Sequence, residues 1–481
     1  MLFNSLNFAL FFPIVFFVYW LLANKKLKIQ NAFLLIVSYF FYSCWDWRFL
    51  FLLLFSTLLD YYTAIKMQDA SNTGKRKFWF WLSIGINLGF LGVFKYYNFF
   101  IDSFAEALAT IGFQVNYTTL NIILPVGISF YTFHGLSYVI DIYNKRIEPV
   151  RNFVDYALFV SFFPLLVAGP IERATHLLPQ IQKKRVFEYS KVVDGMRQIL
   201  WGLFKKVVIA DNCAIYADMI FNDSDNYNGS TLILGALFFA VQIYGDFSGY
   251  SDIALGTARM LGIELLRNFA FPYFSRDIAE FWRRWHISLS TWFRDYLYFP
   301  LGGSRGSKWM SVKNTFIIFL VSGFWHGANW TFIVWGFLNA LYFLPLLLLG
   351  KNRNNLDIVA QGKLLPSLQD VLNIFVTFSL TTLAWIFFRA ESLTHAWSYL
   401  SGIFSDSVFD HPQLSQAGYT TIVLSLLFFI VEWFGRDRQF AISHLGYNWP
   451  QWVRWGFYSL LVVIAGLFMQ TNDTPFIYFQ F

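Results

Sequence analysis

Charged residues are scarce in this chain: 14% of its 481 residues are Asp, Glu, Lys or Arg, against 57% that are hydrophobic. Soluble domains carry about a quarter charged residues, so this composition excludes a water-soluble globular fold. Two cysteines, Cys44 and Cys213, are too few for a disulfide framework and lack metal-ligand spacing, and we expect no metal site. Because no Lys/Arg-rich soluble module is present, the net charge of +7 indicates basic cytoplasmic loops rather than nucleic-acid binding.

What the chain has instead is a series of apolar segments separated by short polar stretches. They predict one membrane domain over residues 1–481, an all-α polytopic protein with about eleven transmembrane helices. We also expect re-entrant or interfacial helices, because several segments are shorter than the roughly 20 residues that span a bilayer. The expected segments are residues 7–23, 31–44, 49–65, 78–94, 122–142, 154–168, 196–210, 232–244, 315–325, 330–349, 371–388, 420–433 and 455–469.

The first segment is expected to be a retained membrane span. Residues 7–23 have no basic residue before them and no small-residue cleavage pattern after them. Lys25, Lys26 and Lys28 follow, which predicts an N-terminus outside and a cytoplasmic C-terminal end of this span. The basic residues at 75–77 fall on the same side if both intervening segments cross.

The stretch SGFWHGANWT, residues 322–331, places a histidine inside a very apolar region. One helix over 315–349 would be about 52 Å long, against a hydrocarbon core of roughly 30 Å. The chain is therefore predicted to break near His326, with Gly323 and Gly327 supplying backbone freedom. Non-helical backbone at membrane depth needs protein or water beside it, so we expect His326 to face an interior cavity. The simpler alternative is a core histidine bonded to a neighbouring backbone group.

Residues 277–303, DIAEFWRRWHISLSTWFRDYLYFPLGG, form a basic, tryptophan-rich segment. Its apolar residues recur at the spacing of one helical face, with Arg283 opposite. This pattern predicts an amphipathic helix at the cytoplasmic interface. An interfacial anchor explains the tryptophans and arginines, but it explains His286, at the edge of the apolar face, less well.

Residues 244–256, YGDFSGYSDIALG, are unusually polar for their surroundings. Gly245 and Gly249 form a small-xxx-small pair that lets helices approach closely. One interpretation is that Asp246, Ser248 and Tyr250 line the same cavity as His326. The alternative is that Asp246 is a buried staple, a side chain whose polar contacts join two helices. Residues 166–173, LVAGPIER, are expected to be a helix terminus followed by a loop.

A deep, water-accessible histidine suits proton transfer. A neutral imidazole can take a proton from a hydroxyl that attacks a carbonyl and return it to the leaving group. Desolvation disfavours imidazolium and keeps the base neutral. Because the sequence contains no P-loop, dinucleotide fingerprint or Ser-His-Asp elbow, acyl transfer within the membrane fits these residues best.

Several blocks resemble the membrane-bound O-acyltransferase superfamily, in its bacterial alginate O-acetylation branch. The blocks are PVGISFYTFHGLSYVID (125–141), VAGPIER, YGDFSGYSDIALG, FWRRWHISLSTWFRDYLYFPLGG, SGFWHGANWTFIVWG and the terminal FIYFQF. The resemblance implies a ring of helices around a central tunnel in the bacterial inner membrane. It also implies that His326 is the essential histidine and His286 the second histidine of the site. We expect substrate-binding residues in the same blocks: Trp285, Asn329, Trp325, Asp246, Ser248, Tyr250, Arg283 and Arg284.

The same resemblance implies acyl transfer from cytoplasmic acetyl-CoA, with no permanently bound cofactor. The acetyl group would cross the membrane to an alginate-like polysaccharide, through a periplasmic acetyltransferase of the SGNH type. Arg283, Arg284 and Arg305 are expected to attract this phosphate-rich donor. Alternatives are D-alanyl transfer from a carrier protein to teichoic acid, a polysaccharide or lipid transporter, and a non-catalytic scaffold. No inverted repeat supports the transporter.

Overall fold

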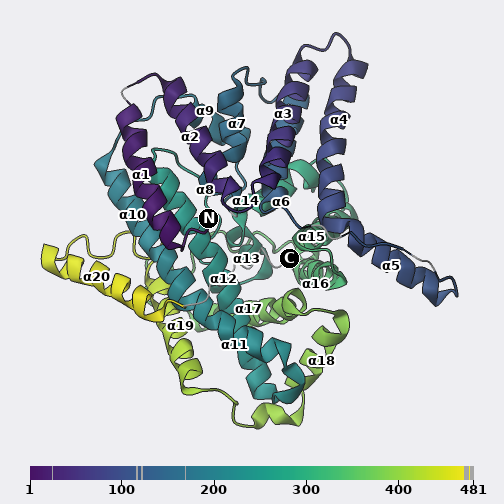
Figure 1. Ribbon diagram of the computed structural model, residues 1–481. Coiled ribbons are helices and arrows are strands. Elements are labelled where there is room, and N and C mark those ends of the chain that lie inside the picture. The colour runs from purple at the N-terminus through teal and green to yellow at the C-terminus, as the bar shows by residue number, and fades with distance from the viewer. Residues whose placement is uncertain (24, 115–116, 121–122, 168, 471–475, 477–481) are drawn as a thin grey trace. The chain divides into compact units, whose positions relative to one another are not determined.

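The described part of the chain is helical. The computed structural model describes residues 1–23, 25–114, 117–120, 123–167, 169–470 and 476, and within them it contains helices and no strand (Figure 1). The beginning of the expected segment 122–142, the end of the segment 154–168, and the FIYFQF block apart from Phe476 lie outside the described residues.

Backbone contacts group the chain into two compact units. Unit 1 comprises Met1–Val192 and Ala258–Leu266, and unit 2 comprises Val193–Thr257 and Arg267–Phe481. The expectation of one domain over residues 1–481 stays a prediction. Two helices, α10 (Tyr189–Leu203) and α12 (Gly229–Met260), have residues in both units.

Unit 1 is built from the N-terminal helices. They are α1 (Leu6–Leu22), α2 (Leu27–Ser43), α3 (Arg48–Gln68), α4 (Thr73–Leu91), the π-helical turn η1 (Gly92–Tyr96), α5 (Tyr97–Thr110), α6 (Ile128–Tyr143), α7 (Phe153–Ser161), α8 (Phe163–Leu166) and α9 (Ala174–Ile181). Side-chain caps start several of them. Ser5 accepts from the N–H of Phe8 at α1, and Asn72 accepts from that of Lys75 at α4.

A buried carboxylate joins α3, α4 and α6 in unit 1. Asp60 on α3 accepts hydrogen bonds from Ser83 at 2.6 Å and Asn87 at 2.7 Å, both on α4. Gly135 on α6 lies directly against the same carboxylate, so that a Cβ there would collide with it. Since polar contacts and small residues hold helices together where both partners are apolar, this cluster fixes the three helices to one another.

Unit 2 contains the later helices and most of the predicted site. They are the π-helical turn η2 (Phe204–Ala210), α11 (Asp211–Asn222), the 3-10 turns η3 (Ser224–Asn226) and η4 (Pro272–Phe274), α13 (Ile278–Arg284), α14 (Ile287–Phe293), the π-helical turn η5 (Arg294–Tyr298), α15 (Lys308–His326), α16 (Trp330–Leu348), α17 (Leu368–Arg389), α18 (Leu393–Ile403), the 3-10 turn η6 (Asp406–Phe409), α19 (Gln416–Phe434) and α20 (Gln451–Phe468).

The close helix approach predicted from glycine spacing is confirmed on α12. A Cβ on Gly249 would lie 2.8 Å from the carbonyl oxygen of Gly202, and a Cβ on Gly256 would lie 2.5 Å from that of Gly195. Both partner glycines belong to α10. The segment YGDFSGYSDIALG lies in the C-terminal half of a continuous 32-residue helix and packs backbone to backbone against α10.

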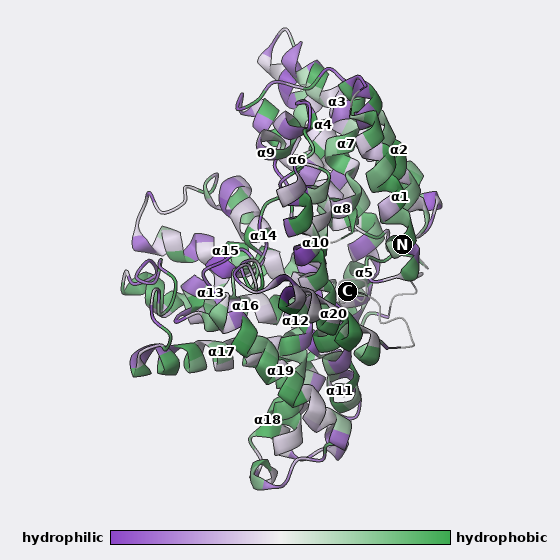
Figure 2. Cartoon of the chain, turned by 90° about the vertical axis from the view of Figure 1, so that its left-hand side faces the viewer, coloured by the Kyte–Doolittle hydropathy of each residue, from purple (hydrophilic) through white to green (hydrophobic). Residues whose placement is uncertain are grey.

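Seven helical stretches of the described residues are long and apolar enough to cross a membrane. They are Arg48–Gln68, Thr73–Thr110, Gly229–Met260, Trp330–Leu348, Leu368–Arg389, Gln416–Phe434 and Gln451–Phe468. α1 is apolar but shorter, and Figure 2 shows hydrophobic residues over much of α1, α2 and α19. Multiple apolar helices are thus confirmed, while the eleven crossings, the ring and the tunnel stay predictions.

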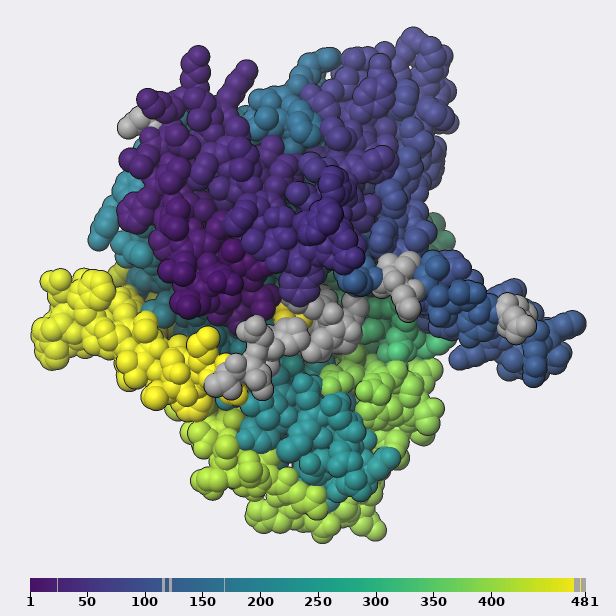
Figure 3. Space-filling view, viewed as in Figure 1, coloured from purple at the N-terminus to yellow at the C-terminus, as the bar shows by residue number. Residues whose placement is uncertain are grey.

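α20 has little of its surface covered by protein. Leu461 is its one buried residue, and Figure 3 shows the helix with most of its side chains open to the surroundings. Trp452, Val462 and Leu467 are all exposed. An apolar helix with so few protein contacts suits a lipid environment, because the acyl chains of lipids cover apolar side chains as well as protein does.

Candidate functional site

His326 lies at the break that the length argument predicts. α15 ends at His326, and α16 begins four residues later at Trp330. Asn329 caps α16: its Oδ1 accepts from the N–H of Thr331 at 3.0 Å, and its Nδ2 donates to the carbonyl of Glu391 at 2.9 Å. The structure therefore shows Asn329, predicted to bind substrate, as the residue that fixes the turn after His326.

The glycines near His326 act differently from the prediction. Gly323 is helical and Gly327 is extended, with φ −165°, so neither conformation needs a glycine. Their role is steric: a Cβ on Gly323 would collide with the carbonyl of Phe332, and one on Gly327 with the Phe332 ring. Gly336 meets the carbonyl of Phe319 in the same way. The missing side chains let α15 and α16 pack closely, which brings His326 against α16.

Aromatic rings surround the His326 imidazole. The residue is 4% exposed. Its ring centroid lies 4.8 Å from that of Trp325, 5.1 Å from that of Trp335 and 5.2 Å from that of Phe388. The interior cavity expected beside His326 stays a prediction.

His286 lies at a second break, which the sequence did not indicate. Residues 277–303 were expected to form one amphipathic helix, but the helix ends at Arg284 and restarts at Ile287. His286 between them has φ 43° and ψ 54°, the left-handed region that costs a non-glycine residue about 1 kcal/mol or more. This turn moves His286 from the edge of an apolar face into the interior, where it is 1% exposed.

The two nitrogens of His286 differ in their surroundings. Nδ1 lies 3.3 Å from Oδ1 of Asn268, while Nε2 is buried with no hydrogen-bond partner among the described residues. The ring stacks edge-on against Phe247, with the centroids 4.6 Å apart. Burial lowers the pKa of His286 to about 3, so this imidazole is neutral at physiological pH.

Trp325 brings the two predicted histidines together. Its ring centroid lies 6.1 Å from that of His286 and 4.8 Å from that of His326. Trp285, also predicted to be in the site, is 1% exposed, and its ring lies 5.0 Å from that of Trp385. The described residues thus place both imidazoles in one cluster of tryptophan and phenylalanine rings.

Asp246 is engaged in a buried ion-pair network. Lys206 on η2 pairs with Asp246 at 2.7 Å and with Asp211 at 2.8 Å. This geometry agrees with the staple between helices rather than with a cavity-lining role for Asp246. Sequence reasoning missed Lys206, although two lysines inside the apolar stretch 196–210 were a visible signal, since charged residues at membrane depth are rare.

Ser248 lines a small polar cavity of about 10 Å³, which is room for about one water molecule. Neighbouring walls carry charges that offset one another: Lys205 pairs with Asp252 at 2.5 Å, and Tyr244 donates to Glu432 at 2.5 Å. The other lining residues are Ser251, Leu255, Arg267, Asn268, Phe269, Phe271, Gln439 and Phe440. Tyr250 is buried nearby on α12, and its ring lies 4.9 Å from that of Phe476.

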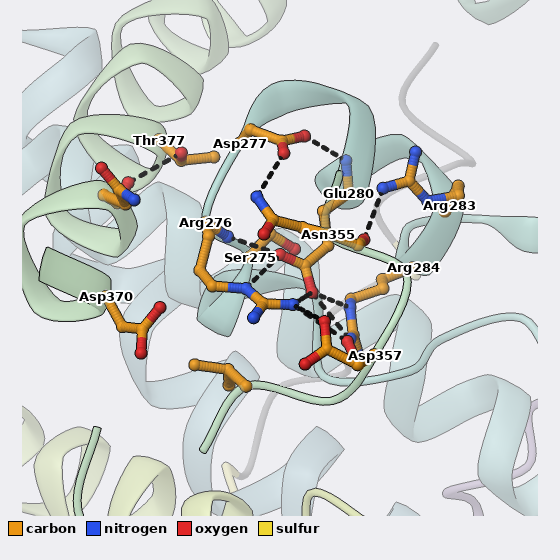
Figure 4. Close-up of polar contacts among 12 residues, drawn as sticks. Ser275, Arg276, Asp277, Glu280, Arg283, Arg284, Asn355, Asp357, Asp370 and Thr377 are labelled. Carbon is orange, nitrogen blue, oxygen red and sulfur yellow. Dashed lines mark hydrogen bonds and ion pairs between the residues drawn. The ribbon is translucent and has the colours of Figure 1, made fainter. Parts of the chain in front are cut away.

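Arg283 and Arg284 line a second hollow, the basic pocket, of about 290 Å³. Figure 4 shows the polar contacts of both arginines. Arg284 pairs with the buried Glu280 at 2.7 Å. Arg283 is exposed and donates to the carbonyls of Asn352 and Asn355 at 2.9 and 2.7 Å. The lining also includes Arg267, Ala270, Leu356, Ile358, Arg436 and Asp437.

The basic pocket has a net positive lining, with four arginines against two carboxylates. Arg267 belongs to both the basic pocket and the polar cavity. An anion in the basic pocket would therefore contact the residue that also borders the polar cavity.

The amino-acid sequence of this chain is similar to those of known membrane acyltransferases. Residues 143–376 match the MBOAT, membrane-bound O-acyltransferase, family. The chain is 39% identical to the probable alginate O-acetylase AlgI of Pseudomonas aeruginosa, over 94% of this chain and 83% of the relative. It is 36% identical to the protein of the same name in Pseudomonas putida, over 100% of both chains. A peptidoglycan O-acetyltransferase of Helicobacter pylori is 33% identical over 100% of this chain and 98% of its own length.

This is a multi-pass membrane acyltransferase. The chain belongs to the membrane-bound O-acyltransferase family, in the branch that contains the alginate O-acetylases.

Proposed function

We propose that this protein is a membrane O-acetyltransferase that moves an acetyl group from cytoplasmic acetyl-CoA across the membrane for O-acetylation of an exported or cell-wall polysaccharide. The observation that carries the proposal is the contact of two buried imidazoles, His286 and His326, with the same indole of Trp325. The names of the relatives, a probable alginate O-acetylase and a peptidoglycan O-acetyltransferase, support this class of acceptor.

His326 is the proposed general base. As the acceptor hydroxyl attacks the acetyl carbon, its proton moves to the neutral imidazole while the C–O bond forms. The C–S bond then breaks, and the proton passes to the departing thiolate, which regenerates the base. Such proton transfer contributes typically 10²–10⁴-fold to rate. His286 is the proposed second histidine, and it is neutral because of its burial.

The basic pocket is the proposed entry site of the donor. Its arginines attract the phosphates of CoA, and Arg283 is exposed enough to reach them. Trp285 and Trp325 are proposed to form apolar walls around the acyl group. Arg284 and Ser248, which line the basic pocket and the polar cavity, are proposed to bind substrate. Asn329, Asp246 and Tyr250 are proposed to shape the substrate-binding site by holding its helices in place.

The proposed setting is the bacterial inner membrane, with the N-terminus outside and a tunnel through a ring of helices. The acetyl group would leave the tunnel for a periplasmic partner of the SGNH type, which modifies an alginate-like polysaccharide. The lipid-facing helices support the membrane setting, since seven stretches of the described residues are apolar enough to cross it.

The decisive experiment compares wild type with His326→Ala in inner-membrane vesicles. We expect thiol release from acetyl-CoA, and the acetyl content of the exported glycan, to fall 10²-fold or more. His411→Ala is the matched control, because His411 is exposed and its Nδ1 lies 3.3 Å from the carbonyl oxygen of Pro412. Size-exclusion chromatography in detergent first checks that each variant is folded.

Each other outcome points to a different function. Loss of glycan export with intact thioester chemistry would identify a transporter, and no change in either would identify a scaffold. Supplying D-alanyl carrier protein in place of acetyl-CoA tests the D-alanyl alternative. Turnover with the carrier protein alone would overturn the acetyl donor while retaining acyl transfer.

A further inference from the structure

Asn268 is held between His286 and the polar cavity by four hydrogen bonds or contacts. It is 1% exposed. Its Oδ1 accepts from the hydroxyl of Ser288 at 2.6 Å, and its Nδ2 donates to the hydroxyl of Ser251 at 3.2 Å. A 2.6 Å separation suits O–H···O but is short for N–H···O, and 3.2 Å suits N–H···O. The distances therefore fix which end of the amide faces which serine.

This orientation determines the proton position on His286. The amide oxygen lies 3.3 Å from Nδ1, and an amide oxygen can only accept a hydrogen bond. Nδ1 must then carry the ring proton, which leaves a lone pair on Nε2. Because Nε2 is buried and has no partner among the described residues, its lone pair is available to a group that enters the site.

The backbone of Asn268 also holds the strained turn at His286. Its carbonyl accepts from the N–H of Ile287 at 2.9 Å, and two residues on, the N–H of Ala270 donates to the carbonyl of Arg284 at 3.0 Å. These two bonds bracket His286. The segment that carries Asn268 therefore hydrogen-bonds to the chain on both sides of the left-handed residue His286, φ 43°.

We propose that Asn268 is a positioning residue that sets the tautomer and orientation of His286, so that Nε2 is the ring nitrogen whose lone pair can accept a hydrogen bond in the acyl-transfer site beside the proposed base, His326. This inference rests on the proposed function for the use of Nε2, but the tautomer itself does not depend on that function. Asn268 acts through His286 and is not assigned a contact with substrate.

The surroundings make Asn268 the main polar influence on this ring. The rings of Phe247, Phe269 and Trp325 cover the imidazole. Asn268 also lines the polar cavity, whose charged lining residues are Lys205, paired with Asp252, together with Arg267 and Glu432. Their signs offset one another, so the neutral amide, rather than a net charge, orients His286.

The test is nitrogen-15 NMR of histidine-labelled protein in liposomes, with the His286 signal assigned by its absence in His286→Gln. Wild type at pH 7 should show a protonated Nδ1 and an unprotonated Nε2. Asn268→Leu should give a mixture of tautomers. Asn268→Asp, which is nearly isosteric, should keep Nδ1 protonated and move the titration of His286 upward by roughly 1–3 pH units, because a carboxylate stabilises imidazolium.

Asn314→Leu and Asn314→Asp are the matched controls. Asn314 is equally buried, and its Nδ2 donates to the carbonyls of Leu301 and Gly303. Neither control should alter the His286 signal. In the transfer assay, Asn268→Leu should lower kcat on the order of 10–100-fold with a nearly unchanged KM, the loss seen when partners that orient an imidazole are removed.

An unchanged His286 tautomer in Asn268→Leu would overturn the inference, as would an unmoved titration in Asn268→Asp. Failure of the proposed function looks different. In that case wild type itself would release no thiol from acetyl-CoA, whereas the tautomer changes would still appear in the NMR spectra.

Discussion

Glu172 illustrates at the residue scale how one buried carboxylate organises its neighbours in unit 1. Its side chain accepts from the N–H of Leu266 at 2.6 Å and pairs with Nδ1 of His176 at 2.7 Å. Its own N–H donates to Nε2 of His134 at 3.0 Å. The sequence predicted a helix terminus followed by a loop here. α8 ends at Leu166, but the non-helical stretch 169–173 is short and α9 begins at Ala174. The role of Glu172 depends on residues 38 and 94 positions away, which no local pattern reveals.

The Glu172–His176 pair predicts a pH dependence of stability. Glu172 raises the pKa of His176, and the charge of Glu264 adds to this. A raised folded-state pKa means that the stabilisation is fully present below the unfolded pKa of about 6.5. It is lost as pH rises through the folded pKa. Since the His176 side chain is 37% exposed, water screens the pair and the effect is small.

The measurement is thermal unfolding in detergent between pH 6 and 9. Wild type should lose more Tm than His176→Gln over this range, by no more than about 2–4 °C, the shift produced by 1 kcal/mol in domains of comparable size. The difference between the two proteins isolates this histidine from other titrating groups. Equal pH dependence of both proteins would contradict the prediction.

At the scale of elements, the packing of α12 against α10 depends on glycine. Gly249→Ala would place a Cβ 2.8 Å from the carbonyl oxygen of Gly202 and 3.1 Å from the backbone nitrogen of Lys206. Because neither atom can move without shifting a helix, we expect a loss of about 1–3 kcal/mol in the free energy of unfolding. Gly456→Ala on α20 is the control, since nothing lies within 4 Å of its added Cβ. Chemical unfolding in detergent measures both.

The buried ion pairs between η2 and α12 give a second prediction for these elements. Lys206→Met leaves Asp211 and Asp246 buried without the lysine that pairs with both. Removing one partner of a buried pair costs about 3–5 kcal/mol. Lys206→Met combined with Asp246→Asn should recover part of the loss, as a double-mutant cycle in unfolding free energy would show. If the changes in unfolding free energy of the two single substitutions simply add in the double variant, a direct interaction between Lys206 and Asp246 is contradicted.

The helix elements were partly predictable. The break at His326 follows from length alone, because 35 apolar residues exceed one bilayer crossing. The break at His286 could not be predicted, since helical spacing continues across it and the turn is held by Asn268, 18 residues away. The 32-residue length of α12 was also missed, because the partners of its polar residues, Lys205 and Lys206, lie on η2.

At the scale of the whole molecule, the direction in which the chain enters the membrane can be tested with its own cysteines. Cys44 is exposed between α2 and α3, whereas Cys213 is buried. With the N-terminus outside and α1, α2 and α3 all crossing, Cys44 lies on the outer side and the loop at Ser71 lies in the cytoplasm. The basic residues 25–28 and 75–77 on the inner side are the physical reason.

A membrane-impermeant maleimide should therefore label wild type in spheroplasts and fail to label Cys44→Ser. In the Cys44→Ser background, Ser71→Cys should react only after the membrane is opened; Ser71 is exposed, so burial would not explain its protection. Labelling of Ser71→Cys in intact spheroplasts would reverse the predicted orientation.

The left-handed turn at His286 has a consequence for how this sequence can change. Glycine or asparagine accepts φ 43° more readily than histidine does, so selection for heat resistance alone would drive the imidazole out of this position. Laboratory evolution run without any demand for activity should discard His286 early. A descendant that keeps it under those conditions would show that the ring serves folding after all.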